Sequence, residues 1–208
     1  MLNVKQLYRE QWDLFRKSLW KSAILLLFVF IVSGIVSYFG FRKNENTVYS
    51  LMQSIWELFE SRGLLDQGNT GLQLAVKLFF NNLTACVMVV LLGLIPIFLP
   101  SAFIVLFNGV ILGATFAFLQ MNGMDIGPML FLGILPHGIF EIPAVVLSGA
   151  LAFHLTMGIF RKSRYSIFSF KKVFMDTAMF FALICVPLLA LAALIEAFIT
   201  PSLMGIYF

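Results

Sequence analysis

Five long apolar runs divide this sequence, and they constrain its fold more than any other feature. Crossing the hydrocarbon core of a bilayer takes about 20 helical residues, and each run is at least about that long. The runs cover residues 22–41, 74–98, 101–120, 128–160 and 173–199. An open chain crosses lipid as helix, because its backbone polar groups must then be satisfied within the segment. We predict an all-α polytopic transmembrane bundle of about five spans, built as a single membrane domain over residues 1–208.

Composition excludes a water-soluble domain. Hydrophobic residues make up 61% of the 208 residues and charged residues only 12%, whereas soluble domains carry about 25% charged residues. No basic patch with interleaved aromatic residues stands out, so we expect no nucleic-acid partner. Cys86 and Cys185 both lie inside apolar runs, which indicates small buried side chains rather than a disulfide or a metal site. The first 21 residues are polar, and the apolar run that follows is longer than the hydrophobic part of a signal peptide. We therefore expect this run to stay in the protein as its first span.

Two polar stretches have amphipathic character. Residues 1–21 place Leu7, Trp12, Phe15 and Leu19 at near-helical spacing with basic residues between them, which predicts a cytoplasmic interfacial helix. Residues 42–73 are the longest polar connection. Within it, residues 48–62 put Leu51, Ile55, Leu58 and Phe59 on one side, so we expect a second surface-lying helix there.

Basic residues predict the orientation. Residues 1–21 and 161–172 together hold ten of the fourteen lysine and arginine residues. The positive-inside rule assigns both segments to the cytoplasm. An even number of crossings must then separate them, so the run 128–160 crosses once. We expect a multi-pass protein of the cell membrane, with a cytoplasmic N-terminus, an extracytoplasmic 42–73 loop and an extracytoplasmic C-terminus.

The fourth run is longer than one span needs and shorter than two spans need. We predict a broken or re-entrant segment, in which a short leading piece, 128–135, precedes one full helix. The break is expected at Pro136-His137-Gly138. Irregular backbone at membrane depth is tolerated only where it is buried in protein or faces water, so the break itself points to a polar interior.

Polar side chains within the runs are the best functional signal, because charge inside a span is expensive. They are Lys77, Asn81, Asn82, Asn108, His137, Glu141, His154, Asp176 and Glu196. Three of these side chains lie near the ends of their runs, where they can reach the membrane–water interface, so their polarity needs no functional role. They are Lys77, His154 and Asp176.

His137 and Glu141 differ from those three. Their spacing of four residues places them on one helical face, and Ser148 shares that face. Lipid burial disfavours an isolated charge, so we expect Glu141 to be protonated or paired, with His137 or a ligand cation as the partner. At a rise of about 1.5 Å per residue, Asn82 and His137 lie at similar depth, and Asn108 lies near the level of Glu141.

We therefore predict an intramembrane polar cluster of Asn82, Asn108, His137, Glu141 and Glu196. Three interpretations stay open. The cluster could be a hydrogen-bonded network between helices, or a binding or conducting site for an ion, a lipid head group or a peptide. It could also be a catalytic divalent-metal site, with His137, Glu141 and Glu196 as ligands and Asn82 or Asn108 orienting the substrate. HxxxE is a weak motif for that chemistry.

Small residues predict close helix packing. Gly109 and Gly113 form a GxxxG pattern, and Gly149 with Ala144 and Ala152 lines part of the fourth run. Such residues let helices approach closely. We expect the contact to lie within one chain, and contact between two copies in a homo-oligomer is the alternative.

Several of these residues recur in one characteristic order. They are Asn81-Asn82, Asn108-Gly109 with Gly113, Pro136-His137-Gly138-Ile139-Phe140-Glu141 with Pro143, and Ile195-Glu196-Ala197-Phe198-Ile199-Thr200-Pro201. Together they resemble the stage II sporulation protein M family of polytopic membrane proteins. The resemblance covers about 81–201, and PHGxFExP combined with IEAFxTP carries most of its specificity.

The resemblance implies a membrane scaffold that localises partners which degrade or remodel peptidoglycan, as in forespore engulfment. It leaves open whether the process is sporulation or another envelope function. We expect a scaffold rather than an enzyme, with no resident cofactor, whose partners are the lipid bilayer and other membrane or cell-wall proteins. The alternatives are an intramembrane metal-dependent hydrolase built on His137, Glu141 and Glu196, and a small transporter or channel subunit. The absence of an inverted repeat and of GxxxxGK[ST] weighs against a transporter.

Overall fold

A computed structural model of the chain describes residues 4–64, 66, 68, 70–95, 97–164 and 169–207. The described residues form helices and no strand, so the predicted all-α class is confirmed. Within these residues, five helical segments are long and apolar enough to cross a membrane, which confirms the predicted number of spans. These segments are Val4–Phe41, Gly71–Leu92, Leu99–Met121, Ile126–Arg161 and Phe170–Gly205.

The segments divide into α-helices and short π-helical turns, labelled η. The α-helices are α1 (Val4–Leu14), α2 (Trp20–Phe41), α3 (Glu45–Ser61), α4 (Gly71–Leu92), α5 (Leu99–Met121), α6 (Ile126–Pro128), α7 (Leu135–Arg164), α8 (Phe170–Phe180), α9 (Val186–Leu194) and α10 (Thr200–Tyr207). The π turns are η1 (Phe15–Leu19), η2 (Met129–Ile134), η3 (Phe181–Cys185) and η4 (Ile195–Ile199).

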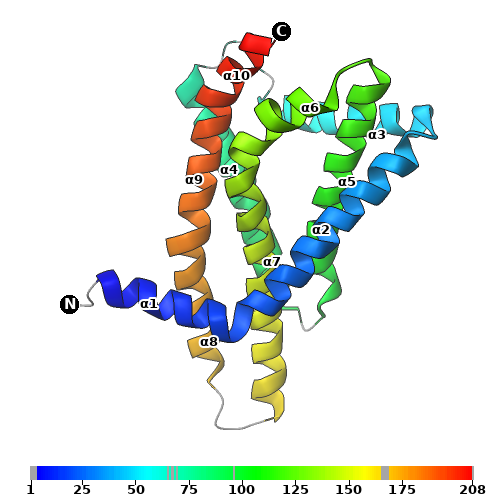
Figure 1. Ribbon diagram of the computed structural model, residues 1–208. Coiled ribbons are helices and arrows are strands. Elements are labelled where there is room, and N and C mark those ends of the chain that lie inside the picture. Colours follow the sequence, from blue (N-terminus) through cyan, green and yellow to red (C-terminus); the bar gives the residue numbers. More distant parts are fainter. Residues whose placement is uncertain are drawn as a thin grey trace.

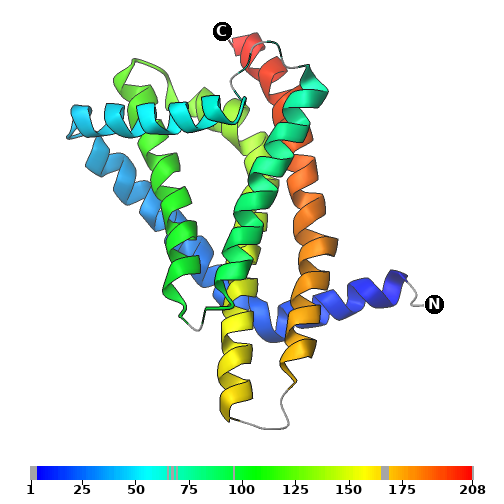
Figure 2. The same cartoon turned by 180° about the vertical axis from the view of Figure 1, so that it is seen from behind.

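The long helices form two groups (Figures 1 and 2). α4, α7 and α9 run side by side, and α2 pairs with α5. α2 starts beside α7 and slopes away from it, so the two groups diverge toward the end where α3 lies crosswise. We call this end the α3 end. α1 lies crosswise nearer the opposite end, where α7 finishes and α8 begins, and we call that the basic end.

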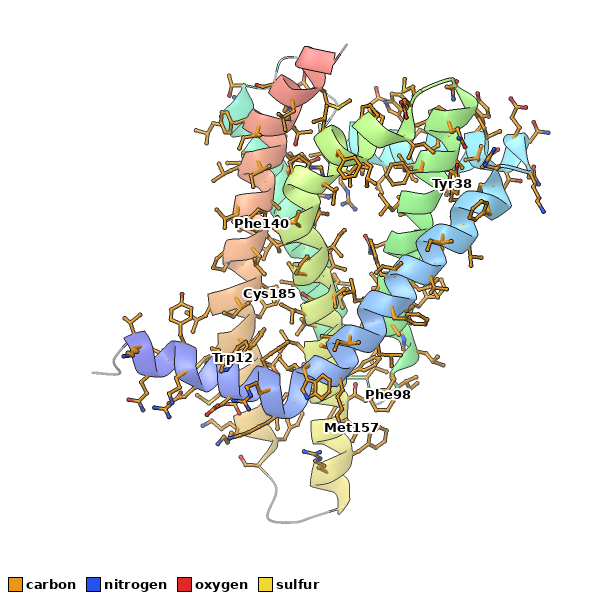
Figure 3. All side chains as sticks on the ribbon, viewed as in Figure 1. Trp12, Tyr38, Phe98, Phe140, Met157 and Cys185 are labelled. Carbon is orange, nitrogen blue, oxygen red and sulfur yellow. The ribbon has the colours of Figure 1, made fainter. Side chains whose placement is uncertain are left out.

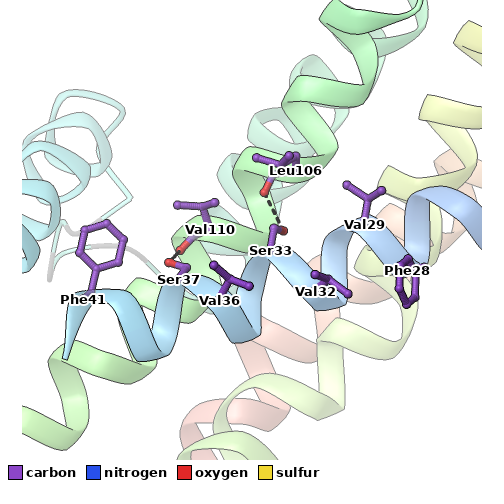
Figure 4. Close-up of a pocket in the computed structure, with 9 residues that line it drawn as sticks. All are labelled: Phe28, Val29, Val32, Ser33, Val36, Ser37, Phe41, Leu106 and Val110. Atoms are coloured by element: carbon purple, nitrogen blue, oxygen red, sulfur yellow. Dashed lines mark hydrogen bonds between the residues drawn. The ribbon is translucent and has the colours of Figure 1, made fainter. Parts of the chain in front are cut away.

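Glycines allow α2 and α5 to touch backbone to backbone. A Cβ atom on Gly113 would collide with the carbonyl oxygen of Gly34, and one on Gly109 would collide with the carbonyl of Phe30. Two serines of α2 reinforce the crossing, because Ser33 donates to the Leu106 carbonyl at 3.0 Å and Ser37 to the Val110 carbonyl at 2.7 Å (Figure 4). The GxxxG pattern is therefore used within the chain, as predicted.

The second span is shorter than the predicted run 74–98, because α4 ends at Leu92. Gly93 follows the helix in a tight turn, and a Cβ atom there would collide with the backbone of Ala152 in α7. The packing of α4 against α7 therefore requires glycine at the point where α4 stops.

The fourth segment is irregular, but the predicted break at Pro136-His137-Gly138 is wrong. The helix continues through these residues, and the irregular part is the π turn η2 directly before them. Figure 1 shows the chain bending there as α6 turns into α7.

Three of the four π turns share one sequence feature: each is followed two residues later by a proline. Pro136 follows η2, Pro187 follows η3 and Pro201 follows η4. Proline lacks an N–H and its ring clashes with the carbonyl four residues earlier. A wider turn before the proline relieves that clash, because it moves the carbonyl away from the ring.

Both predicted surface helices are present, but α3 packs through a different set of residues than expected. Val48 and Met52 are buried against Ala114 and Ala117 of α5. Leu51 and Ile55 are partly buried beside them, whereas Leu58 and Phe59 are exposed. α5 is therefore covered by the first half of α3 only.

Candidate functional site

His137, Glu141 and Glu196 converge. Each offers one potential ligand atom, and the three atoms lie within 4.8 Å of one another. All three side chains are half-buried between helices. Figure 3 labels Phe140, the residue before Glu141, in the part of α7 that is closer to the α3 end. We call these three residues the triad.

Two helices position the triad. His137 and Glu141 are one turn apart in α7, so they project from one face. Glu196 lies in the π turn η4, which widens the last span at this level. π turns re-aim the side chains that follow the extra residue, and they occur frequently at functional sites. The π turn η4, which precedes Pro201, therefore carries Glu196, the third residue of the triad.

Polar neighbours orient the triad. The Thr200 hydroxyl lies 3.5 Å from Nδ1 of His137. The Asn82 side chain lies close enough to the Glu141 carboxyl group to interact with it. Asn81 in turn donates to Oδ1 of Asn82 at 3.1 Å.

Arg62 extends this network to the surface. Its guanidinium donates to Oδ1 of Asn81, directly after α3 ends at Ser61. Two hydrogen bonds therefore join Arg62, Asn81 and Asn82, and Asn82 in turn neighbours Glu141; we call this row of side chains the polar line. It links the surface helix α3 to a carboxyl group at membrane depth.

Asn108 of the predicted cluster lies apart from this network. Its amide donates to the Ile104 carbonyl of its own helix at 2.8 Å. No hydrogen bond within the described part of the chain joins it to the triad or to Asn82. A role for Asn108 in orienting a substrate stays a prediction.

Thr200 and Arg62 were missed by sequence reasoning. Thr200 is four residues after Glu196 and adjacent to Pro201, so helical spacing could have suggested it. Arg62 lies outside the apolar runs, and only the packing of the α3 end brings it to Asn81. Ser148, predicted on the His137–Glu141 face, is buried and donates to the Ala144 carbonyl at 2.7 Å.

The triad has the donor set of an open divalent-metal site. One imidazole nitrogen and two carboxylate oxygens suit zinc, manganese or iron, and three protein ligands leave room for water or substrate. A tetrahedral zinc with bonds of about 2 Å needs ligand atoms about 3.3 Å apart, so a small inward adjustment of the side chains would close the site. Without a cation, two ionised carboxylates this close would repel each other.

The two free cysteines take no part in this chemistry. Cys86 and Cys185 are both buried and unpaired. This agrees with their predicted role as small buried side chains.

Comparison with protein families gives a match over most of the chain. Residues 23–201 match the family described as stage II sporulation protein M. The matched range contains the triad, the asparagine pair, the second half of the segment Val4–Phe41 and the other four apolar segments in whole or in large part. Comparison with curated proteins and with solved structures finds no match.

Proposed function

This chain belongs to the stage II sporulation protein M family, and we propose that it is a membrane scaffold that recruits peptidoglycan-remodelling proteins. The proposal combines the resemblance of the PHGxFExP and IEAFxTP segments with one structural observation, the free outer face of α3. Its partners are extracytoplasmic wall hydrolases, which meet the membrane at the α3 end.

α3 is suited to docking because only one of its sides is packed. Val48 and Met52 face α5, while the opposite side carries exposed polar residues with a net negative charge. These residues are Ser50, Gln53, Ser54, Glu57 and Ser61. Gln53 donates to Glu57 at 3.0 Å, which orders this surface. The hydrogen bond from Arg62 to Asn81 also links the end of α3 to α4.

Charge reversal on this face tests the proposal. The tagged protein is purified from crosslinked cells, and the co-purified hydrolase activity is measured on peptidoglycan. We expect Glu57→Lys to lower the recovered activity by about tenfold, the effect of losing one strong interface contact.

Glu10→Lys is the matched control. Glu10 is also exposed, lies on the other surface helix and accepts a hydrogen bond from the glutamine four residues earlier. It should recover hydrolase activity at the wild-type level. Equal recovery with both variants, or no hydrolase with the wild-type protein, contradicts docking on α3. Equal amounts of helical protein in the membrane fraction exclude misfolding.

A second candidate function is divalent-cation binding by the triad, and it is favoured by the mutual distance of at most 4.8 Å between its ligand atoms. A cation there would neutralise two neighbouring carboxylates. Through the polar line it would also fix the position of α3, so cation binding and docking could act together. A hydrolase needs the same cation plus a bound water.

Cobalt titration of chelator-free protein tests this candidate, because cobalt gives visible absorption bands in nitrogen and oxygen sites. We expect stoichiometric cobalt for the wild-type protein and for Asp176→Asn, whose carboxylate lies outside the triad. Glu196→Gln should lower cobalt affinity by about a hundredfold, because a metal ligand is lost. Absence of any bound metal, by titration and by elemental analysis, would rule the candidate out.

A further inference from the structure

A second polar feature lies at the basic end, far along α7 from the triad. A pocket of about 470 Å³ opens there between α7 and the start of α2. Its polar lining consists of Lys17, Ser18, Lys21, Ser22, His154 and Arg161. The two predicted basic segments therefore meet in space, although more than a hundred residues separate Lys21 from Arg161.

The cations of this pocket are only partly neutralised. Lys17 lies 4.0 Å from the Asp13 carboxylate, one turn earlier on the surface. Lys21 sits over the Trp20 ring at 5.6 Å from its centroid. Within the described residues, no ion pair joins Lys21 or Arg161 to an acid. The pocket therefore has a net positive charge.

Its floor is apolar. Phe98, Phe153 and Met157 complete the lining, and the Phe98 and Phe153 rings meet edge to face at 5.2 Å between centroids. Figure 3 places Phe98 and Met157 where α2 passes in front of α7. A ligand that combines an anionic group with a hydrocarbon part would therefore match both parts of this lining.

One polar atom of the lining has no partner. Nε2 of His154 is buried and makes no hydrogen bond within the described part of the chain. Buried polar atoms are nearly always paired, so this atom is a candidate contact for a ligand oxygen. The charged side chains that act on the ring are Asp176 and Arg161.

We propose that this pocket binds the phosphodiester head group of an anionic phospholipid. Lys21 and Arg161 contact the phosphate oxygens, Ser18 and Ser22 offer hydroxyl donors, and one acyl chain lies along Phe98, Phe153 and Met157. Basic pockets between transmembrane helices recognise lipid head groups in this way. A free phosphate ester would use the same cations, but it would leave the aromatic floor uncovered.

Brominated lipid provides a direct test with the full chain in detergent micelles. Bromine on the acyl chain quenches tryptophan fluorescence at contact distance, and Trp20 borders Lys21 at the pocket. In a Trp12→Phe/Trp56→Phe background, Trp20 is the single reporter. We expect saturable quenching by brominated phosphatidylglycerol and weaker, non-saturating quenching by brominated phosphatidylcholine.

Charge-matched variants separate a site from general attraction. Lys21→Gln/Arg161→Gln should lower the affinity for phosphatidylglycerol by about tenfold or more, since each surface cation contributes to anionic-lipid binding. Arg9→Gln/Arg16→Gln removes the same charge from the same end without touching the pocket lining, and should leave the affinity within about twofold. Lys21→Arg/Arg161→Lys should retain binding, which controls for folding.

Three results would overturn the proposal. Equal affinity for phosphatidylglycerol and phosphatidylcholine would remove the role of charge. Equal loss in the two glutamine variants would show non-specific attraction. Full displacement of the lipid by glycerol phosphate or inorganic phosphate at similar concentration would identify a free phosphate ester as the ligand.

Discussion

At the scale of single residues, spacing alone identified two of the three triad residues. His137 and Glu141 share a helical face because they are four residues apart, and any regular helix brings them together. Glu196 belongs to another span, and its convergence with them depends on how α9 and η4 pack against α7. The rise per residue could estimate the depth of Glu196 in the membrane, but it could not predict that its side chain faces α7.

Gly113 gives a prediction at this scale. A Cβ atom there collides with the Gly34 carbonyl, so Gly113→Ala should separate α2 from α5 and destabilise the protein by roughly 2 kcal/mol, a typical cost of overpacking. Gly40→Ala is the control, because nothing lies within 4 Å of its Cβ position. Unfolding by denaturing detergent measures both, and equal stability of the two variants would contradict the close crossing.

At the scale of elements, the apolar runs predicted the number of membrane-spanning helices. They did not predict where those helices depart from regular α-helix. The observed spans follow the apolar runs because lipid requires continuous helix. The prolines within these runs were visible, yet a proline can kink, break or widen a helix. Here Pro136, Pro187 and Pro201 each follow a π turn, so the fourth segment bends before Pro136 and does not break.

Pro201 gives a prediction at this scale. Pro201→Ala restores the missing N–H and removes the ring clash, so η4 should relax to regular α-helix and rotate Glu196 away from His137. We expect cobalt affinity to fall by about tenfold, because the ligand geometry is disturbed while all ligands remain. Pro100→Ala is the control, since Pro100 lies in the first turn of α5, a helix that holds no triad residue. Unchanged affinity in Pro201→Ala would show that η4 does not position Glu196.

At the scale of the whole molecule, the structure places the described residues of both basic segments at one end. Lys17 and Lys21 line the same pocket as Arg161, and α3 lies at the other end. This arrangement agrees with an even number of crossings between the two segments. The predicted orientation, with the basic end in the cytoplasm, follows from the positive-inside rule.

Cysteine accessibility tests the orientation. In a background with Cys86→Ala and Cys185→Ala, Asp66→Cys reports on the α3 end and Ser169→Cys on the basic end, and both positions are exposed. An impermeant thiol reagent should label Asp66→Cys in intact cells and Ser169→Cys only after the membrane is opened. The reverse pattern would place the proposed docking face of α3 in the cytoplasm.

The sequence by itself determined that the chain folds in lipid and crosses it about five times, because both depend on local hydrophobicity. It also determined that His137 and Glu141 share a helical face, because that depends on helix periodicity. It also indicated close packing through Gly109 and Gly113. Only the tertiary structure decided which distant groups meet: Glu196 with Glu141, Arg62 with Asn81, and Lys21 with Arg161 around one pocket. Those contacts depend on the tilt and rotation of whole helices, which many weak packing contacts set together.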